Sequence, residues 1–515
     1  MRTENSVKNS STAFIGNLLA YLIAFIAQAI FIKILGTEYL GLNGLFSNVL
    51  STLSIFELGI GNAIVFNLYK PIEFNDNEKI KSLMNFYKKA YIIIALLIAF
   101  FGILLLPFIN VFIGDNSLNI NFYFVYILSL LSTIVSYLMV YKRNLIIANQ
   151  KNYIINIIHV LYLILLNISQ VIILYKTKNY YLYLVIKILY QLLENFVINI
   201  VANKMFPLLL EKKIYKLDKK TEKDIFSKVK ALIYHKIGGI LVIGTDNIII
   251  SMIFGLNTVG IYTNYNTITT AVSGLFSQII STTTSSVGNL LVENNYQKNF
   301  SVFKKMRFLN FWIASFTSIC IFLLIQPFIT LWIGEQYLLE FYIIIFIIIN
   351  FYQKMMRNVY GTFKDSAGIW MEDKYIPIIE SILNIAFSII LGYSIGLAGV
   401  FMGTIISGLV LWCYSYPKFV YKKLFNRSYI DYAKETIGYI VLFLTLASGT
   451  YYISTLFIFD NVWLQLISNS LIALIIPNIV LIFIFRKTDN FKYFIDLIKK
   501  IINKVYNKLH KKHSR

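Results

Sequence analysis

Fourteen apolar stretches, each long enough to cross a lipid bilayer, dominate this 515-residue sequence. A helix needs about 20 apolar residues to span the hydrocarbon core of a membrane. The stretches cover residues 11–33, 44–68, 90–111, 121–141, 153–175, 180–202, 231–254, 260–291, 308–332, 339–360, 376–394, 397–417, 436–457 and 462–485. We therefore predict an all-α polytopic membrane protein with about fourteen transmembrane helices.

The composition agrees with this class and excludes several others. Hydrophobic residues make up 57% of the chain and charged residues only 14%, whereas soluble domains are about a quarter charged. Ordinary cytosolic enzymes and disordered chains are thereby excluded, and two cysteines cannot build a disulfide framework. The four histidines are scattered, so we predict no metal site and no cofactor. The net charge of +22 would suggest nucleic acid as the partner of a soluble protein; here we assign it to basic cytoplasmic loops.

The distribution of basic residues predicts the orientation. If the N-terminus is cytoplasmic, 42 of the 47 Lys and Arg lie on the inside, and only Lys33, Lys176 and Lys178 lie outside. The remaining two, Lys187 and Lys236, fall within spans. Cytoplasmic loops of membrane proteins carry this excess of basic residues. We expect both termini to be cytoplasmic, in a multi-pass protein of the bacterial cytoplasmic membrane.

The predicted outside loops are too short for a catalytic domain, the longest having about a dozen residues around 110–121. They carry only a few isolated acids, which disfavours a membrane-bound glycosyltransferase or polymerase, so we predict no enzymatic activity. A glycine-rich phosphate loop is missing from the sequence, which argues against ATP-driven transport. Residues 13–32 are too long for the apolar core of a signal peptide and lack a cleavage site, so we expect the first span to be retained.

An internal duplication emerges when the sequence is shifted by 219 residues. Gly36 and Gly41 then coincide with Gly255 and Gly260, and Phe46 with Tyr265. Each stretch joins an odd-numbered span to the next even-numbered one. Two six-span blocks would face the same way and enclose a central cavity, although chance similarity of two loops is the alternative. We predict two pseudo-symmetric six-helix lobes plus two extra C-terminal helices.

This organisation defines five segments. They are an N-lobe (1–202), a basic cytoplasmic linker (203–230), a C-lobe (231–420), helices 13 and 14 (421–485) and a basic tail (486–515). The tail places its apolar residues on one side of a helix and its lysines on the other, as in helices that lie on the anionic inner leaflet.

Polar side chains at membrane depth supply the candidate binding residues, because ionisable groups there are costly and tend to face a bundle interior. The candidates for a substrate or ion cavity are Asn17, Gln28, Glu57, Lys187, Gln191, Glu194, Lys236, Asp246, Asn264, Tyr265, Lys354 and Arg357.

Structural explanations compete for most of these candidates. Lys187 and Glu194 could form an ion pair within one helix, and Lys236 could extend to the inner interface. Lys354 and Arg357 could mark the cytoplasmic end of a short span. Glu57 and Asp246 lie far from predicted helix ends. An unpaired buried carboxyl tends to take up a proton, which suits an ion-coupled transporter, although structural hydrogen bonding would explain both residues as well.

Several motifs resemble the bacterial polysaccharide (O-antigen and capsule type) flippases of the multidrug/oligosaccharidyl-lipid/polysaccharide exporter superfamily. They are LGTEYLGLNGLF at 35–46, FELGIGNA at 56–63, LYKP at 68–71, YHKIGG at 234–239, GTDNIIIS at 244–251, VGIYTNY at 259–265, AGIW at 367–370, Asn384 and GVFMGTIIS at 399–407. The resemblance extends from the first span to about the twelfth.

This resemblance implies two lobes around a central, often cationic cavity. Its ligand would be an undecaprenyl-pyrophosphate-linked oligosaccharide, flipped from the inner to the outer leaflet by alternating access. Glu57, Asp246 and Arg357 lie in matching stretches and become cavity candidates. Spans 13 and 14 would form a groove for the lipid tail. The implied partners are this glycan, anionic inner-leaflet lipids at the tail, and polymerases or glycosyltransferases of the same pathway.

Coupling to an ion gradient, by H⁺ or Na⁺, is the expected energy source. The alternative function is a cation-coupled multidrug or small-molecule antiporter on the same fold. Efflux of cationic dyes and an acidic rather than a basic cavity would distinguish it from a flippase.

Overall fold

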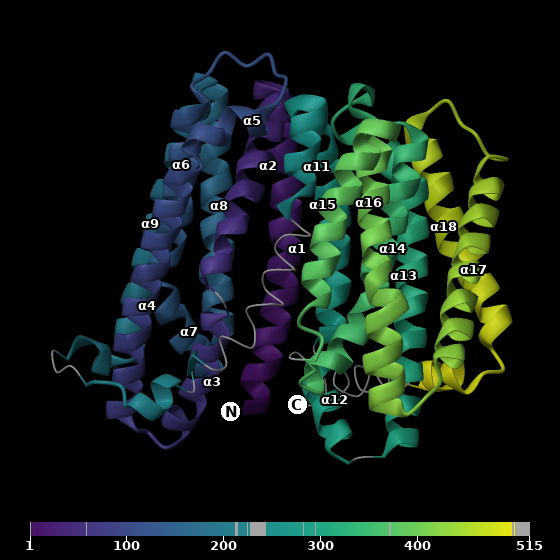
Figure 1. Cartoon of the computed structure of the whole chain (residues 1–515). Helices are drawn as coiled ribbons and strands as arrows, with labels where there is room; N and C mark the ends of the chain where they lie inside the picture. The colour runs from purple at the N-terminus through teal and green to yellow at the C-terminus, as the bar shows by residue number, and fades with distance from the viewer. Residues whose placement is uncertain are drawn as a thin grey trace, which may run out of the picture. The chain divides into compact units, whose positions relative to one another are not determined.

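The computed structural model describes residues 2–57, 59–211, 215–223, 225–226, 244–281, 283–293, 295–369, 372–496 and 499. Within these ranges every regular element is a helix, and eleven helices are long and apolar enough to cross a membrane (Figure 1). The prediction of an all-α polytopic membrane protein is therefore confirmed. The count of fourteen spans is compatible with this structure and stays a prediction.

The α-helices are bounded as follows: α1 Arg2–Leu35, α2 Thr37–Thr52, α3 Ile60–Glu73, α4 Asn77–Leu104, α5 Ile109–Ile113, α6 Phe122–Tyr137, α7 Val140–Ala148, α8 Asn152–Thr177, α9 Tyr180–Met205, α11 Asp246–Ser281, α12 Thr284–Val292, α13 Tyr296–Trp332, α14 Phe341–Ser366, α15 Ile376–Ile395, α16 Leu397–Val410, α17 Tyr429–Ser454 and α18 Val462–Phe485. The short 3₁₀ turns are η1 Leu53–Glu57, η2 Leu106–Phe108, η3 Pro207–Leu210 and η4 Glu335–Tyr337, and η5 Leu411–Leu424 is a π-helical continuation of α16.

The chain divides into two compact units. Unit 1 comprises residues 1–266 and 374–407, and unit 2 comprises residues 267–373 and 408–515. These units are defined by contacts, whereas the predicted lobes are defined by sequence symmetry, so the lobe boundaries stay a prediction.

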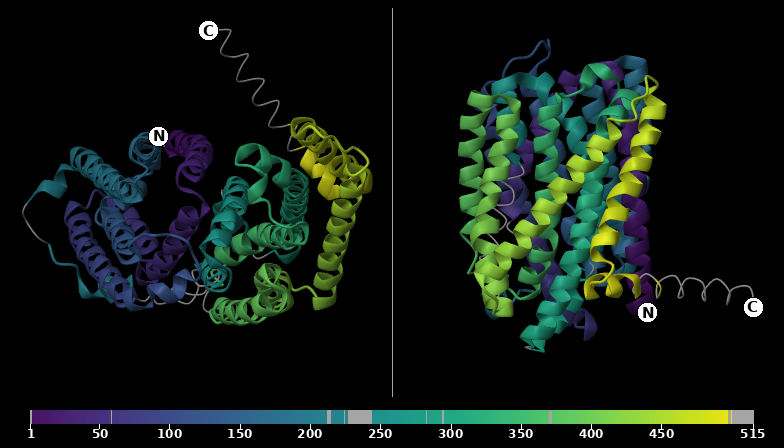
Figure 2. Two further views of the ribbon diagram at one scale, coloured as in Figure 1. Left: turned by 90° about the horizontal axis from the view of Figure 1, so that it is seen from above. Right: turned by 90° about the vertical axis from the view of Figure 1, so that its right-hand side faces the viewer.

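Unit 1 is a helical bundle seen nearly end-on in the left view of Figure 2. Its helix α8 packs against α1 and α9, α6 packs against α9 and α4, and α3 packs against α4 and α7. Leu42, Leu45, Ile64 and Leu83 are completely buried in its core. Leucine and isoleucine faces on neighbouring helices thus fix the positions of the polar residues between them.

Unit 2 is organised around α13, which packs against α14, α17 and α18. Aromatic residues dominate its core, with Phe303 and Phe311 fully buried. Tyr352 of α14 and Phe443 of α17 stack with ring centroids 3.8 Å apart. The extra helices α17 and α18 pack against each other as well as against α13, so they belong to the same packed unit.

The second predicted span, 44–68, is not one continuous helix. It is divided into α2, η1 and α3, and Gly59 before α3 has a φ of 74°. Glycine is the residue that adopts this left-handed conformation without strain. The prediction of an unbroken span was wrong because apolar content measures membrane burial and carries no information about backbone direction.

Left-handed backbone positions recur at the spacing of the predicted duplication. Four pairs of described residues with positive φ lie 218 to 220 positions apart: Gly36 and Gly255, Gly114 and Gly334, Gln150 and Gly368, and Lys178 and Gly396. Each residue lies at a helix end, except Gly255, which interrupts α11. Chance similarity of one loop does not produce four matched turns, so the described residues support an internal repeat of about 219 residues.

Ion pairs and a hydrogen bond connect part of the predicted linker to the beginning of α4. Lys79 binds Asp218 and also donates to Thr221 at 2.8 Å, and Lys81 binds Glu211 at 2.9 Å. The Lys79 ammonium and the Thr221 amide hold the pKa of the Asp218 carboxyl below its usual range. That carboxylate therefore stays charged throughout the physiological pH range.

Some sequence predictions lie outside the described residues. Residues 227–243, with His235 and Lys236, are among them, and so is the tail from 500 onward. The described beginning of the tail packs against α13, where Phe491 and Phe494 lie 5.8 and 5.9 Å from the ring of Trp312. Tail binding to the inner leaflet stays a prediction.

Candidate functional site

Two equivalent glycines of the internal repeat form a close helix contact in unit 1, which we call the glycine seam. A Cβ atom on Gly41 would lie closer than 3.0 Å to the carbonyl oxygen of Leu256. A Cβ atom on Gly260 would lie closer than 3.0 Å to the carbonyl oxygen of Thr37. Leu256 and Thr37 are themselves 219 positions apart, so the contact is reciprocal. Only glycine allows the two backbones to approach this closely.

One hydrogen bond lies within the glycine seam and another lies beyond it along α11. The Thr37 hydroxyl donates to Asn257 Oδ1 at 2.6 Å, and the Gln28 amide donates to Asn264 Oδ1 at 2.6 Å. Asn264 is completely buried. The structure thus brings together Gln28 and Asn264, both candidates from the sequence, although they are 236 residues apart.

Tyr265 is also completely buried. A side chain without exposed surface contacts a ligand only if the surrounding helices separate. We therefore treat Asn264 and Tyr265 as residues of the glycine seam that would become accessible in a different conformation, rather than as lining of an open cavity in this one.

Asp246 lies at the beginning of α11 in a polar network that includes residues of α15 and α16. Asn384 donates to Thr404 Oγ1 at 3.0 Å, and the Thr404 hydroxyl lies 3.5 Å from Asp246 Oδ1. Thr245 donates to the other end of the Asn384 amide at 3.2 Å. Asn384 is fully buried, whereas Asp246 is half-buried. The carboxylate is thus oriented by a buried framework while one part of it stays accessible.

Glu57 is located where the second span is interrupted, at the end of η1. The Tyr91 hydroxyl of α4 donates to Glu57 Oε1 at 3.3 Å. Discontinuous helices in transporters commonly supply substrate or ion sites, because their freed polar groups need partners. The helix break was unexpected, and it strengthens Glu57 as a candidate.

Glu194 of α9 is paired on both sides, but not with Lys187. Arg143 of α7 lies 3.1 Å from Glu194 Oε2, and His159 of α8 lies 3.0 Å from Oε1. The Glu194 side chain is only 3% exposed. The predicted alternative of an ion pair between Lys187 and Glu194 was therefore wrong. Both residues occupy one face of α9, but they are two helical turns apart and Glu194 is held by neighbouring helices instead.

Lys187 has neither an ion pair nor a hydrogen bond within the part of the chain that the structure describes. It is half-buried in the middle of a helix long enough to span the membrane. An unpaired ammonium in such a position costs free energy. This makes Lys187 a stronger candidate for binding an anionic group than Glu194, whose charge is already satisfied.

Opposite effects on stability are expected when these two residues are neutralised. Glu194→Gln removes the counter-charge of Arg143, and we expect the free energy of unfolding to fall by about 1–3 kcal/mol. Lys187→Met removes an unpaired charge and should keep or raise stability by about 1 kcal/mol while reducing transport. Unfolding in detergent and transport in cells would be measured for both variants. Equal destabilisation by both would contradict the assignment.

The remaining candidates occupy dissimilar environments. Gln191 accepts a hydrogen bond from Ser132 at 2.7 Å, which ties α9 to α6. Asn17 on α1 and Lys354 on α14 are exposed. The guanidinium of Arg357 lies against Gly408, where an added Cβ would come closer than 3.0 Å. The position of the Arg357 guanidinium therefore requires a small residue at 408 in the neighbouring helix. Arg357 and Lys354 both belong to unit 2.

Sequence reasoning missed two arginines because it assigned them to cytoplasmic segments. Arg143 belongs to α7 and binds Glu194. Arg307 of α13 is only 1% exposed, and it donates to Glu435 at 2.7 Å and to Thr436 at 2.9 Å. Its guanidinium also lies over the rings of Tyr360, Tyr421 and Tyr439. A tyrosine-rich stretch around 416–439 was the signal available in the sequence.

The chemistry of these groups is suited to binding rather than to covalent catalysis. Amides, hydroxyls, carboxylates and an ammonium are positioned by the packed helices. The described residues contain no group of three or more His, Cys, Asp or Glu that could hold a metal ion. Such groups replace the water that a polar solute loses on entering a membrane.

Several solved membrane transporters share the fold of this chain. The chain is similar to the lipid II flippase MurJ in an inward closed conformation, with 15% identity, a TM-score of 0.69, and coverage of 93% of this chain and 99% of that one. It is also similar to a MATE transporter of Vibrio cholerae (11% identity, TM-score 0.57, 83% and 99% covered) and to an inward-facing multidrug resistance MATE transporter of the MOP superfamily (17%, 0.53, 76% and 91%).

Among families, the match is to polysaccharide biosynthesis proteins, whose model covers residues 6–284. This chain belongs to that family, which confirms the resemblance seen in the motifs. No curated protein matches it in sequence. The solved structures that share its fold are a flippase and MATE transporters by their names.

Proposed function

We propose that this protein flips an undecaprenyl-pyrophosphate-linked oligosaccharide from the inner to the outer leaflet of the cytoplasmic membrane by alternating access. The main support is the combination of a polysaccharide biosynthesis family match with a MurJ-like fold over almost the whole chain. MurJ is a lipid II flippase by its name.

A protein that carries a polar head group across hydrocarbon needs polar groups of its own within the membrane. A glycan and its pyrophosphate cannot cross hydrocarbon unless each lost hydrogen bond to water is replaced. Gln28, Lys187 and Asp246 supply donors, acceptors and charges within helices long and apolar enough to span a membrane. Glu57 in η1 and Arg357 in α14 add further charges. The polyprenyl chain stays in the lipid, so only the head group requires a polar path.

A change of protonation or ion occupancy at Asp246 or Glu57 would reset the cycle. Asp246 is half-buried in the network of Thr404 and Asn384, and Glu57 lies at a helix break. Loss of the charge would weaken the hydrogen bonds that hold either carboxylate. Transport that continues unchanged without H⁺ and Na⁺ gradients would contradict this coupling.

Surface polysaccharide in a deletion strain tests the function. We expect lipid-linked oligosaccharide to accumulate in the membrane and polysaccharide to be lost from the cell surface. The wild-type gene should correct both defects. Asp246→Asn should restore less than about one tenth of the surface glycan, as expected when a charged hydrogen-bonding group is lost at a binding site. Asp460→Asn is the matched control, because Asp460 is exposed in the loop between α17 and α18.

The competing function makes the opposite prediction. A multidrug antiporter would leave surface glycan normal in the deletion strain and raise sensitivity to cationic drugs. The similarity to MATE transporters is the reason for considering this function.

Pathway polymerases or glycosyltransferases would be partners of a flippase only. Co-purification of one of them with this protein from membranes would therefore favour the flippase.

A further inference from the structure

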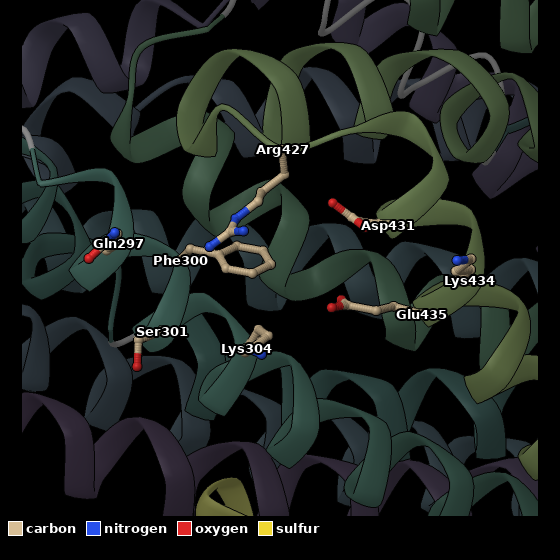
Figure 3. Close-up of a pocket in the computed structure, with 8 residues that line it drawn as sticks. All are labelled: Gln297, Phe300, Ser301, Lys304, Arg427, Asp431, Lys434 and Glu435. Carbon is tan, nitrogen blue, oxygen red and sulfur yellow. The ribbon is translucent and has the colours of Figure 1, made fainter.

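A polar pocket lies in unit 2, where the beginnings of α13 and α17 meet. Its volume is about 470 Å³, and its lining includes Phe300, Lys304, Arg427, Asp431, Lys434 and Glu435 (Figure 3). Three cations and two carboxylates therefore face one small space. A pocket of this size accommodates a phosphate-bearing head group rather than a whole oligosaccharide.

Two of the three cations of this pocket lie over an aromatic ring rather than against the neighbouring carboxylates. Arg427 lies 4.6 Å and Lys304 5.4 Å from the ring centroid of Phe300, and Figure 3 shows Arg427 over that ring. Neither residue, nor Lys434, forms an ion pair within the described part of the chain. Glu435 instead binds Arg307 and accepts from Tyr421 at 2.6 Å. The pocket thus retains positive charge for an anion.

An apolar groove continues from the pocket along α17. It has a volume of about 660 Å³ and is lined by residues that include Ile437, Gly438, Val441 and Thr445. Lys434 lines both the pocket and the groove. A charged pocket that shares one lysine with an open apolar groove on α17 is suited to an amphiphile.

The surrounding charge favours a position of this site at the inner leaflet. The same end of unit 2 carries Lys305, Lys422 and Lys423 in addition to the basic residues of the pocket. By the positive-inside rule we expect this end to be cytoplasmic, and the cytoplasmic leaflet contains the anionic lipids.

We propose that this pocket and groove bind one anionic phospholipid of the inner leaflet, with its phosphate among Lys304, Arg427 and Lys434 and an acyl chain across Gly438. The site differs from the basic tail and from the polar residues proposed to contact the transported head group. It fastens α13 and α17 together through the lipid, because each helix contributes cations to the same phosphate.

Lipid binding to the full-length protein tests the proposal. Delipidated protein in detergent would be titrated with phosphatidylglycerol or phosphatidylcholine, and bound lipid counted by native mass spectrometry. Wild type should prefer phosphatidylglycerol, and the triple variant Lys304→Gln, Arg427→Gln, Lys434→Gln should bind it about tenfold less tightly or worse, because its charge-assisted contacts are gone. The control triple variant Lys89→Gln, Lys204→Gln, Lys220→Gln removes the same charge from exposed lysines of unit 1, outside the pocket, and should bind normally.

The groove is tested separately by a glycine pair on the same helix. Added side chains at Gly438 and Gly449 both meet open space, but only Gly438 lines the groove. Gly438→Leu should fill the groove and weaken phosphatidylglycerol binding severalfold, whereas Gly449→Leu should not. Both variants are expected to fold, because leucine is a better helix former than glycine.

Three results would overturn the proposal. Unchanged phosphatidylglycerol binding by both the pocket triple variant and Gly438→Leu would remove the site. Inorganic phosphate that competes at the same concentration as the lipid would make it a site for a free anion. Binding of undecaprenyl pyrophosphate in place of phosphatidylglycerol would make it a loading point for the transported lipid.

Discussion

Gly41→Ala is expected to lose most surface polysaccharide in the complemented deletion strain, although alanine is intrinsically the better residue for a helix. The new methyl group would lie closer than 3.0 Å to the carbonyl oxygen of Leu256. That neighbour is backbone, so the helices must separate. Overpacking of this kind costs about 1–3 kcal/mol. The conformation that contains the closed glycine seam would then be about five- to 150-fold less populated.

Gly260→Ala should have the same effect, because its methyl group would meet the carbonyl oxygen of Thr37 in the reciprocal position. The double variant should retain about as much surface polysaccharide as either single variant, since both changes open the same contact. Gly449→Ala is the control, because an added Cβ there meets open space. Membrane abundance of each variant is measured alongside surface polysaccharide. Normal glycan in Gly41→Ala cells at normal abundance would show that the glycine seam need not close.

The glycine seam also shows how far sequence reasoning reached. The spacing of 219 residues between Gly36–Gly41 and Gly255–Gly260 predicted equivalent positions. Positive φ at Gly36 and Gly255 and the reciprocal contacts of Gly41 and Gly260 are what such an equivalence requires. Glycine carries this information because a backbone conformation or close approach excludes all other residues. The direct contact between the two stretches was not predictable, because repetition does not indicate how the copies pack.

The charged candidates were harder to interpret. Periodicity correctly placed Lys187 and Glu194 on one face of a helix, but the partner of Glu194 came from α7 and α8. Arg143 was assigned to a cytoplasmic loop because it follows the apolar stretch 121–141. A hydropathy average covers many residues at once, so it cannot reveal that the side chain of Arg143 binds the buried Glu194 carboxylate. Pairing across helices depends on tertiary packing, which a single sequence does not show.

Glu435→Met is expected to be among the most destabilising substitutions in unit 2. It removes the carboxylate bound to Arg307 at 2.7 Å and leaves a guanidinium that is only 1% exposed. Breaking a buried ion pair by removing one partner typically costs about 3–5 kcal/mol. The Glu435 side chain is 33% exposed, which favours the lower end of that range. Unfolding of the purified protein in mixed detergent micelles measures the effect.

The double variant Arg307→Met, Glu435→Met should recover a large part of this loss, because no charge is then left buried without a partner. The exposed pair Lys298–Glu293 is the matched control, since both side chains are 52% exposed. Lys298→Met and Glu293→Met should each change stability by less than about 1 kcal/mol. If the double variant is as unstable as the sum of its single variants, the ion pair is not the source of the effect. The aromatic rings of Tyr360, Tyr421 and Tyr439 would then be sufficient to stabilise the guanidinium without Glu435.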